Sequence, residues 1–147
     1  MVPRQRSTLR PSVLDNIGLE AALQFEARQF RERTGIVCRV SVPRQPLKLG
    51  QDLATGVFRV YQELLTNIAR HAKATRVHVS LGRKGRQLTL RVSDNGCGIG
   101  ESAVHSPEAL GLQGMRERAS LLGGTIRFQG RRGEGTTVQL TVPLSLA

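Results

Sequence analysis

The sequence has few aromatic residues and few residues that form disulfides or zinc sites. Phenylalanine, tyrosine and tryptophan together make up 3% of the 147 residues, so a core must be built from leucine, valine, isoleucine and alanine. The two cysteines, Cys38 and Cys97, form no C-x-x-C pair and cannot supply a disulfide framework, which favours a reducing cytoplasmic setting. His78 and His105 show no metal-ligand spacing, so the sequence gives no argument for a zinc site.

Long apolar runs and acidic residues are also scarce. No stretch approaches the roughly 20 residues of a membrane span, and the N-terminus shows no signal-peptide pattern. The formal net charge is +11, with 22 basic residues against 11 acidic ones. Because the basic residues do not cluster on one helix, a solvated basic surface, or one suited to an anionic ligand or an acidic partner protein, is favoured over a nucleic-acid binder.

Hydrophobic periodicity predicts a single domain of alternating helices and strands. Residues 1–17 show no clear period and are interpreted as a tail or the end of another element, and residues 18–147 as the domain. The predicted helices are 18–34, 52–73 and a short one near 112–122, and the predicted strands are 36–42, 76–81, 88–93, 125–129 and 136–142.

The predicted strands are apolar on one side only. Strands buried on both faces read as continuous apolar runs, so these strands should have helices on a single face. The sequence therefore predicts an α/β two-layer sandwich, with a mixed, mainly antiparallel sheet and helices on one face.

The stretch "VSDNGCGIG", residues 92–100, places the carboxylate of Asp94 at a strand end with glycines directly behind it. Its G-x-G-x-G spacing is not the G-x-G-x-x-G of a dinucleotide site, and the chain contains no G-x-x-x-x-G-K-[ST] loop. A carboxylate is an acceptor suited to an exocyclic amine such as adenine N6, and Gly96 and Gly98 would let a flat base approach the main chain. The alternative is a plain turn, since Asp, Asn and Gly are turn formers.

The polar side of the long helix carries a second pattern. Glu63, Asn67 and His71 recur at i, i+4 and i+8, with Arg70 alongside. A carboxylate and an amide oxygen one turn apart are hard ligands suited to Mg²⁺, and an arginine is suited to phosphate. The alternative is an ordinary solvent-facing side of a helix.

Two further stretches contain paired glycines. In "GLQGMRERA" (111–119), Gly111 and Gly114 are expected to open a helix and direct N–H groups toward an anion. The alternative is a glycine turn that caps a packed helix. In "GEGTT" (133–137), hydroxyl groups at a strand start could support Asp94.

Taken in order, these four stretches resemble the N, G1, G2 and terminal G-x-G-T motifs of the GHKL ATP-binding superfamily. That superfamily includes histidine kinases, gyrase, Hsp90 and mismatch-repair ATPases, and the likeness extends from about Gly18 to Pro143. "YQELLTNIARHA", "DNGCGI" and "GLQGMRERA" are similar to the motifs of sensor histidine kinases related to nitrate/nitrite and hexose-phosphate sensors. "LRPSVLDNIGLEAAL" resembles the segment that links the dimerisation helices of those kinases to their ATP-binding domain.

The resemblance implies that the chain binds ATP and Mg²⁺. Asn67 would hold the metal, Glu63 would position metal or water as the one catalytic candidate, and Asp94 would read adenine. The loop from about Gly100 to Gly114 would form a mobile lid. The other implied cofactor-binding residues are Arg70, His71, Gly96, Gly98, Ile99, Gly111, Leu112, Gly114, Met115, Thr136 and Thr137.

The resemblance also implies partners. The phosphoacceptor histidine of those kinases lies upstream of "LRP", and no histidine precedes His71 here, so the acceptor is expected on a separate dimerisation domain of a parent kinase. A response regulator with a helix-turn-helix output domain is the implied next partner. The domain is expected to be cytoplasmic, in a parent kinase anchored in the inner membrane, with no nucleic-acid or membrane contact of its own.

Two alternatives stay open at this point. One is a free-standing ATPase or anti-sigma-factor-type kinase of the same fold. The other is a basic nucleic-acid-binding module, for which the nearly aromatic-free sequence offers little base stacking.

Overall fold

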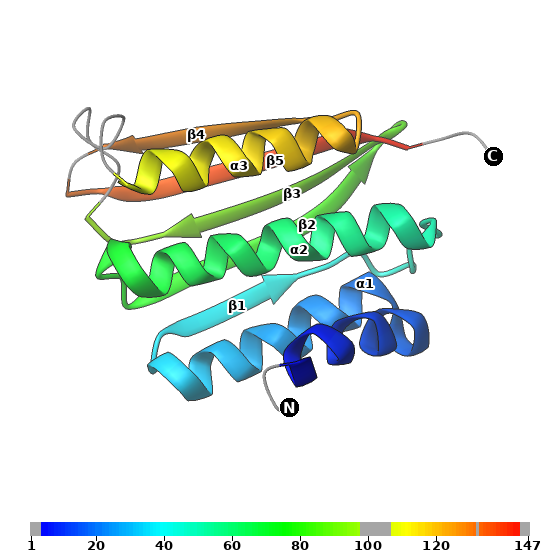
Figure 1. The fold of residues 1–147 in the computed structure, drawn as a ribbon, viewed down its shortest axis with the longest axis horizontal. Helices are drawn as coiled ribbons and strands as arrows, with labels where there is room; N and C mark the ends of the chain where they lie inside the picture. Colours follow the sequence, from blue (N-terminus) through cyan, green and yellow to red (C-terminus); the bar gives the residue numbers. More distant parts are fainter. Residues whose placement is uncertain (1–3, 98–106, 132, 145–147) are drawn as a thin grey trace.

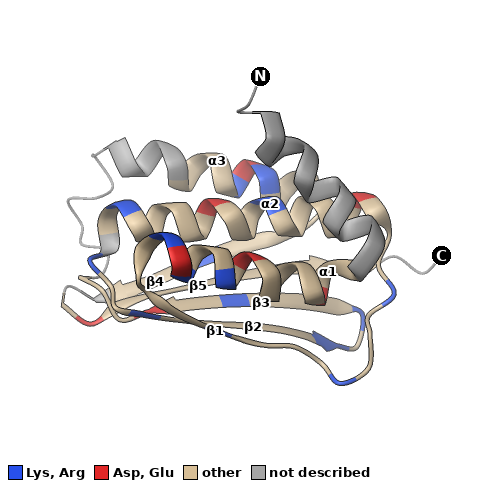
Figure 2. Ribbon diagram, turned by 90° about the horizontal axis from the view of Figure 1, so that it is seen from below, with Lys and Arg blue, Asp and Glu red and all other residues tan. Residues whose placement is uncertain are grey.

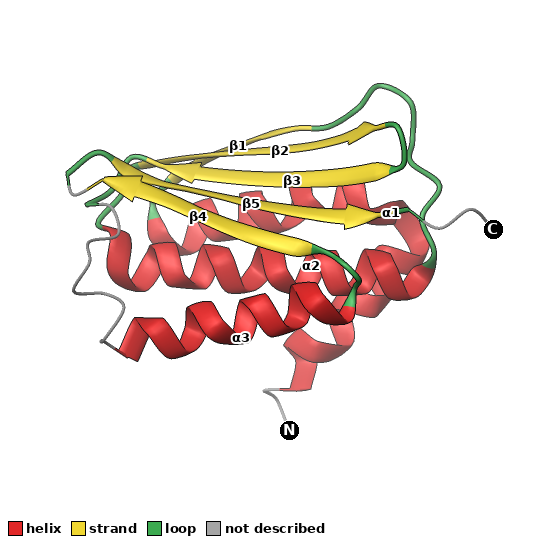
Figure 3. Cartoon of the chain, turned by 90° about the horizontal axis from the view of Figure 1, so that it is seen from above, coloured by secondary structure: helices red, strands yellow, loops and turns green. Residues whose placement is uncertain are grey.

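The computed structural model describes residues 4–97, 107–131 and 133–144. These residues form one five-stranded sheet with α1, α2 and α3 packed on a single face (Figures 1 and 3). The predicted two-layer architecture is confirmed. The elements are α1 (Arg4–Thr34), β1 (Val37–Ser41), α2 (Gln51–Asn67), the π-helix η1 (Ile68–Ala72), β2 (Arg76–Lys84), β3 (Gln87–Asp94), α3 (Pro107–Leu121), β4 (Thr125–Arg131) and β5 (Gly135–Pro143).

The sheet has the strand order β1-β2-β3-β5-β4. β1 pairs with β2 in parallel, and the other three pairings are antiparallel. Leu88, Leu90 and Val92 alternate along β3 and are buried under the helices, as period-two patterning requires. The face that carries the helices is called the inner face below, and the opposite one the outer face. The prediction of a mixed, mainly antiparallel sheet is confirmed.

Helix α1 begins at Arg4, earlier than the predicted start at residue 18. Leu9, Val13 and Ile17 recur at i, i+4 and i+8, so a helical period extends into the residues interpreted as a tail or the end of another element. A break at Gly18 (φ 81°, ψ 169°) separates this segment from the predicted helix. That helix ends as predicted at Gly35, whose N–H donates to the carbonyl of Arg31 at 2.8 Å. No described helix is both long enough and apolar enough to cross a membrane.

Helix α2 follows the predicted apolar stripe and supplies much of the core. Its buried side chains are Val57, Phe58, Val60, Tyr61, Leu64 and Leu65. Past Asn67 the helix continues as the π-helix η1, and Lys73 closes it in a left-handed conformation (φ 53°). Short π-helical turns are frequent at functional sites.

The core is aliphatic, as predicted, with a few aromatic side chains at its centre. Phe30, Phe58 and Tyr61 are each less than 3% exposed. The Tyr61 hydroxyl donates to the carbonyl of Leu23 at 2.8 Å, and burial raises the pKa of that hydroxyl. Burial also raises the pKa of the nearby Cys38 thiol to about 11, against a hydrogen bond with Tyr61 that lowers it.

Strands β2 to β5 are longer than the sequence predicts because the turns between them are tighter, whereas β1 is shorter than the predicted strand 36–42. β2 and β3 leave only the two-residue turn Gly85–Arg86, and Gly85 has a φ of 61° there. β4 and β5 reach Arg131 and Gly135, so the connection between them is shorter than the predicted strands 125–129 and 136–142 leave. Positive φ at a turn is the conformation that favours glycine.

Candidate functional site

The predicted motifs gather at one end of the molecule. Figure 1 shows the end of α2, the tip of β3, the start of β5 and the start of α3 at the same end of the sandwich. Each motif therefore contributes from the terminus of its element. A strand end and a helix end leave backbone groups and side chains exposed for a ligand, while the elements behind them hold the positions.

Asp94 is the last residue of β3 and continues the inner-face series of Leu88, Leu90 and Val92. Its side chain is half-buried, and its Oδ1 accepts a hydrogen bond from the Gly96 N–H at 2.8 Å. Burial raises the pKa of the carboxyl, while hydrogen bonds from the N–H groups of Gly96 and Thr136 oppose that rise. Among the described residues no cation forms an ion pair with it. The site thus contains a partly desolvated acceptor that is not neutralised.

Asn95 fixes the position of Asp94. Its Oδ1 accepts from the N–H groups of Thr75 and Arg76, both at 2.9 Å, and its Nδ2 donates to the Thr75 hydroxyl at 2.9 Å. These bonds join the end of β3 to the start of β2. Sequence reasoning treated Asn95 only as a turn former, although asparagine's habit of bonding nearby backbone was the available signal.

Gly135 and Thr136 of "GEGTT" lie directly beside Asp94. Gly135 has a φ of 90°, and a Cβ there would collide with the Asp94 carbonyl oxygen and stand 3.1 Å from the Asn95 Cα. Thr136 is the cross-strand partner of Asp94 and shares the inner face. Thr137 lies on the outer face, where its hydroxyl meets that of Ser93 at 3.0 Å. The structure therefore brings Thr136, and not Thr137, to Asp94.

Glu63 and Asn67 lie on the side of α2 that faces α3. Gly56 lies on this side of α2. A Cβ at position 56 would stand 2.5 Å from a methyl carbon of Leu122, which lies just past the end of α3. Residues 63 and 67 follow Gly56 by seven and eleven positions, which is close to two and three full helical turns. Both side chains are half-buried. Their carboxylate and amide oxygens therefore lie along the boundary between α2 and α3.

Arg70 and His71 lie in η1, and both are exposed. The carbonyl of His71 accepts from the Cys97 thiol at 3.4 Å, and the carbonyl of Cys97 accepts from the Gly133 N–H at 2.6 Å. Three predicted motifs are thus joined at Cys97, through its thiol to η1 and through its carbonyl to the turn before β5. The bond to Cys97 places η1, with Arg70 and His71, beside the loop that follows Asp94.

Helix α3 begins earlier than predicted. It starts at Pro107, so Gly111 and Gly114 lie inside the helix and do not open it. The expectation that their N–H groups face an anion is therefore wrong, because helical N–H groups beyond the first turn bond within the helix. Met115 is buried in the core and Leu112 packs against it. Gly98, Ile99 and much of the predicted lid lie outside the described residues.

Residues 52–146 match the family described as histidine kinase-, DNA gyrase B- and HSP90-like ATPases. The chain belongs to this ATPase family. The match includes the helix with Asn67, the strand that ends at Asp94 and the turn before Thr136, which are the parts that the structure assembles at one end.

Relatives of this ATPase-family chain include histidine kinases. The oxygen sensor histidine kinase NreB of Staphylococcus carnosus is 36% identical over 137 residues, which cover 93% of this chain and 40% of that protein. The histidine kinase domain of a blue-light activated histidine kinase from Erythrobacter litoralis has a TM-score of 0.73 and 26% identity, over 86% of this chain and 61% of that one. The Acinetobacter baumannii histidine kinase AdeS shares the fold, with a TM-score of 0.67 and 16% identity over 95% of this chain and 76% of that one. This chain thus spans less than two thirds of the first two relatives.

The residues of this ATPase-family site fit a nucleotide with its metal. The carboxylate of Asp94 has no ion-pair partner within the described residues and accepts hydrogen bonds, as an amino group on a base requires. No cluster of three or more His, Cys, Asp or Glu side chains occurs in the described part of the chain. Magnesium characteristically takes only one or two protein oxygens and completes its shell with phosphates and water. Glu63 and Asn67 offer such oxygens.

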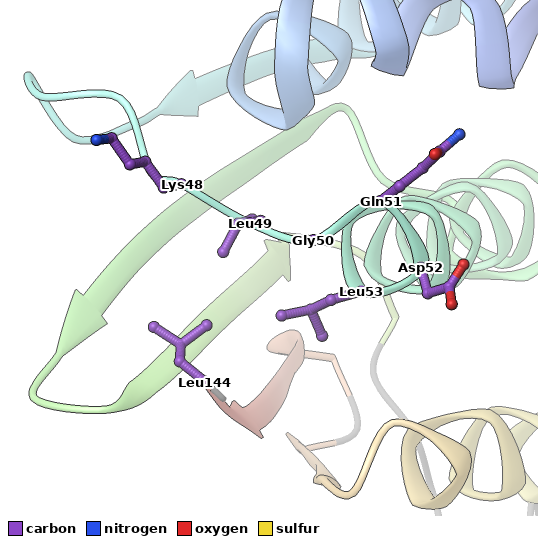
Figure 4. Close-up of a pocket in the computed structure, with 7 residues that line it drawn as sticks. All are labelled: Lys48, Leu49, Gly50, Gln51, Asp52, Leu53 and Leu144. Carbon is purple, nitrogen blue, oxygen red and sulfur yellow. The ribbon is translucent and has the colours of Figure 1, made fainter. Parts of the chain in front are cut away.

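A cavity of about 620 Å³ lies away from this site, at the N-terminal end of α2 (Figure 4). The side chains of Leu49, Leu53 and Leu144 converge on it. Its lining contains none of the predicted site residues. The cavity is therefore separate from the candidate nucleotide site of this ATPase-family chain.

Proposed function

We propose that this chain is the ATP-binding catalytic domain of a two-component sensor histidine kinase. It holds Mg·ATP and presents the γ-phosphoryl group to a histidine on a dimerisation domain. The observation that carries the proposal is the half-buried carboxylate of Asp94, which lacks a cationic partner among the described residues and stands in a chain of the ATPase family. The kinase activity is supported by relatives whose names are histidine kinases.

In this proposal Asp94 recognises the adenine base of ATP. Its carboxylate accepts a hydrogen bond from the exocyclic amine of adenine, whereas guanine presents a carbonyl oxygen at the corresponding position. Because Gly96 is buried and has no side chain, it lets the flat base approach the main chain. Thr136 adds a hydroxyl next to Asp94 on the same face of the sheet.

Asn67 and Glu63 hold the metal, and Arg70 and His71 face the phosphates. When bound, magnesium neutralises phosphate charge and orients the transferred group. The amide of Asn67 is a direct ligand, and Glu63 orients the metal or its water. Phosphoryl transfer between positioned partners depends mostly on such placement and charge neutralisation, so the domain needs no nucleophile of its own.

The remaining partners follow from the kinase assignment. Residues 1–17 are the segment that leads from the dimerisation helices, and residues 18–147 are the catalytic domain. The phosphorylated histidine passes its phosphoryl group to a response regulator with a helix-turn-helix output domain. The parent kinase is anchored in the inner membrane, with this domain on the cytoplasmic side.

The experiment that tests the proposal follows ATP labelled on the γ-phosphate. Incubated with Mg²⁺ and this chain alone, the nucleotide should bind and stay intact, because no acceptor histidine is presented. Adding the dimerisation domain of the parent kinase should produce an acid-labile phosphohistidine on that domain. Steady release of inorganic phosphate by the chain alone would refute the proposal and favour a free-standing ATPase of the same fold.

A further inference from the structure

The outer face of the sheet carries positive charge and no carboxylate in its described part. Alternation along the strands places five exposed cations there: Arg39, Arg76, Lys84, Arg91 and Arg127. The sole acidic residue in the described strands is Asp94, which points to the inner face. Figure 2 shows the acidic residues mainly on the helices, and Figures 2 and 3 show the outer face without a covering layer.

The charge on the outer face is ordered but not neutralised. The Arg91 guanidinium donates to the Gln139 Oε1, from Nε at 3.2 Å and from Nη2 at 2.7 Å, and that amide carries no charge. His78 meets the hydroxyl of Ser41 at 3.3 Å between its Nε2 and the Oγ. The ion pair within the described residues, Arg33 with Glu26, lies on α1. Neutral partners thus hold this face in place and leave its cations available.

The cations are close enough to act together. Arg91 and Arg127 share one cross-strand row with Gln139 between them, so their backbones are about 10 Å apart at the usual strand spacing. This separation is similar to the screening length of about 8 Å at physiological ionic strength. Their potentials therefore add into one positive field over the face, which a single scattered arginine would not produce.

We propose that the outer face binds the acidic surface of a partner protein. Carboxylates match the planar fork of arginine, and four of the five cations are arginines. Ser41, Ser80 and Gln139 lie between them and supply neutral hydrogen-bonding groups for the rest of the contact. The partner meets the molecule on the side of the sheet opposite the nucleotide site, so both ligands can be held together.

The same face is poorly suited to nucleic acid or a bilayer. Phe30, Phe58 and Tyr61 are buried, Phe25 lies on α1 and Phe128 lies on the inner face. The described outer face therefore has no aromatic ring on which a base could stack. This face is the surface of a five-stranded sheet and lacks the protruding helix or two-stranded ribbon that enters a major groove. The exposed large hydrophobic residue of the described chain is Leu121, which lies on α3, so this face has no apolar anchor for lipid.

The test measures binding of labelled poly-L-glutamate, as a stand-in for the partner's carboxylates, to the whole chain and to two triple variants. One variant replaces three outer-face arginines by glutamine (Arg39→Gln, Arg91→Gln, Arg127→Gln). The control replaces three exposed helix arginines (Arg28→Gln, Arg31→Gln, Arg118→Gln) and has the same net charge. We expect about tenfold weaker binding for the outer-face variant and less than about twofold weaker binding for the control. Each exposed charge pair contributes little to the binding free energy, but the three pairs lost on the outer face add up. Equal loss in both variants would overturn the proposal, because only net charge would then matter.

Two further titrations distinguish a protein from a membrane or a nucleic acid as the anionic partner of the outer face. Phosphatidylserine vesicles and duplex DNA are titrated at the same ionic strength, and tighter binding to either than to poly-L-glutamate contradicts a protein partner. Mg·ATP affinity should be unchanged in the outer-face variant, because its substitutions lie on the face opposite Asp94; this separates the proposal from the kinase assignment. If the triple variant does not fold, Arg127→Gln is compared with Arg118→Gln, and binding about twofold weaker for Arg127→Gln than for Arg118→Gln is expected.

Discussion

Replacing Gly135 by alanine should damage the nucleotide site and the fold together, whereas the same change at Gly133 should damage neither strongly. Gly133 lies in the turn before β5 and Gly135 is the first residue of β5, and both have positive φ, 83° at Gly133 and 90° at Gly135. A Cβ at Gly133 would meet no atom within 4 Å, but at Gly135 it would collide with the Asp94 carbonyl oxygen. The two positions therefore separate backbone conformation from steric contact with Asp94.

The expected losses of stability follow from the backbone conformation and from the steric contact with Asp94. A left-handed conformation in a non-glycine residue costs about 1–2 kcal/mol, which is the whole effect expected for Gly133→Ala. The overlap at Gly135 adds about 1–3 kcal/mol, as overpacking does elsewhere. Gly135→Ala should therefore lower the free energy of unfolding by about 2–5 kcal/mol. Part of the strain should be relieved by moving Asp94, which should weaken ATP binding.

Urea denaturation followed by far-ultraviolet circular dichroism measures the stability of each variant, and calorimetric titration measures Mg·ATP affinity. Gly133→Ala serves as the matched control and should bind ATP as the wild type does. Equal losses of stability in the two variants, or unchanged ATP affinity in a folded Gly135→Ala, would refute the steric argument.

Three other substitutions test separate parts of the site. Asp94→Ala should weaken ATP binding about ten- to hundredfold, from the loss of roughly 1.5–3 kcal/mol in a hydrogen bond to a charged group; an unchanged dissociation constant would exclude the base-reading role. Asn67→Ala should weaken Mg·ATP more than metal-free ATP, and an equal loss in both titrations would contradict the ligand assignment. Asn95→Ala removes the bonds to Thr75 and Arg76 and should cost about 1–3 kcal/mol of stability with weaker ATP binding; thermal unfolding that matches the wild type would show that these bonds do not secure the strand end. Burial raises the pKa of Asp94, so its stabilising contribution is present below the pKa of the unfolded chain and is lost as the pH rises through the raised value. Relative to Asp94→Asn, the wild type should therefore lose stability as the pH rises past about 3.9, the ordinary pKa of an aspartate carboxyl, and urea midpoints that move in parallel would contradict this sign.

Much of the fold follows from patterns within single elements. The alternation of Leu88, Leu90 and Val92 predicts a one-sided strand, and the structure buries all three. The same alternation extended by two residues places Asp94 on the inner face. Extended backward along β5 from Val138, it places Thr137 on the outer face, so the sequence already contained the reason to separate Thr137 from the site.

The start of α3 was not predictable from local propensity. Gly111 and Gly114 are weak helix formers and suggest a helix start, yet the helix continues through both because Met115 and Leu112 pack against the core. Tertiary packing thus overrides the intrinsic cost of glycine in a helix.

The supports of the site depend on contacts between segments that are distant in sequence. Asn95 bonds the backbone at Thr75 and Arg76, and Gly135 lies against the carbonyl of Asp94. A motif shows that a glycine or an asparagine is present but not which backbone it meets. Only the pairing of β3 with β2 and β5 supplies that information.

The most direct measurement titrates the whole chain with Mg·ATP and Mg·GTP under the same conditions. A carboxylate at residue 94 accepts from the amino group of adenine and repels the carbonyl oxygen of guanine, so ATP should bind at least about tenfold more tightly. Equal affinity for the two nucleotides, or a preference for GTP, would contradict base recognition by Asp94 and with it the proposed nucleotide site.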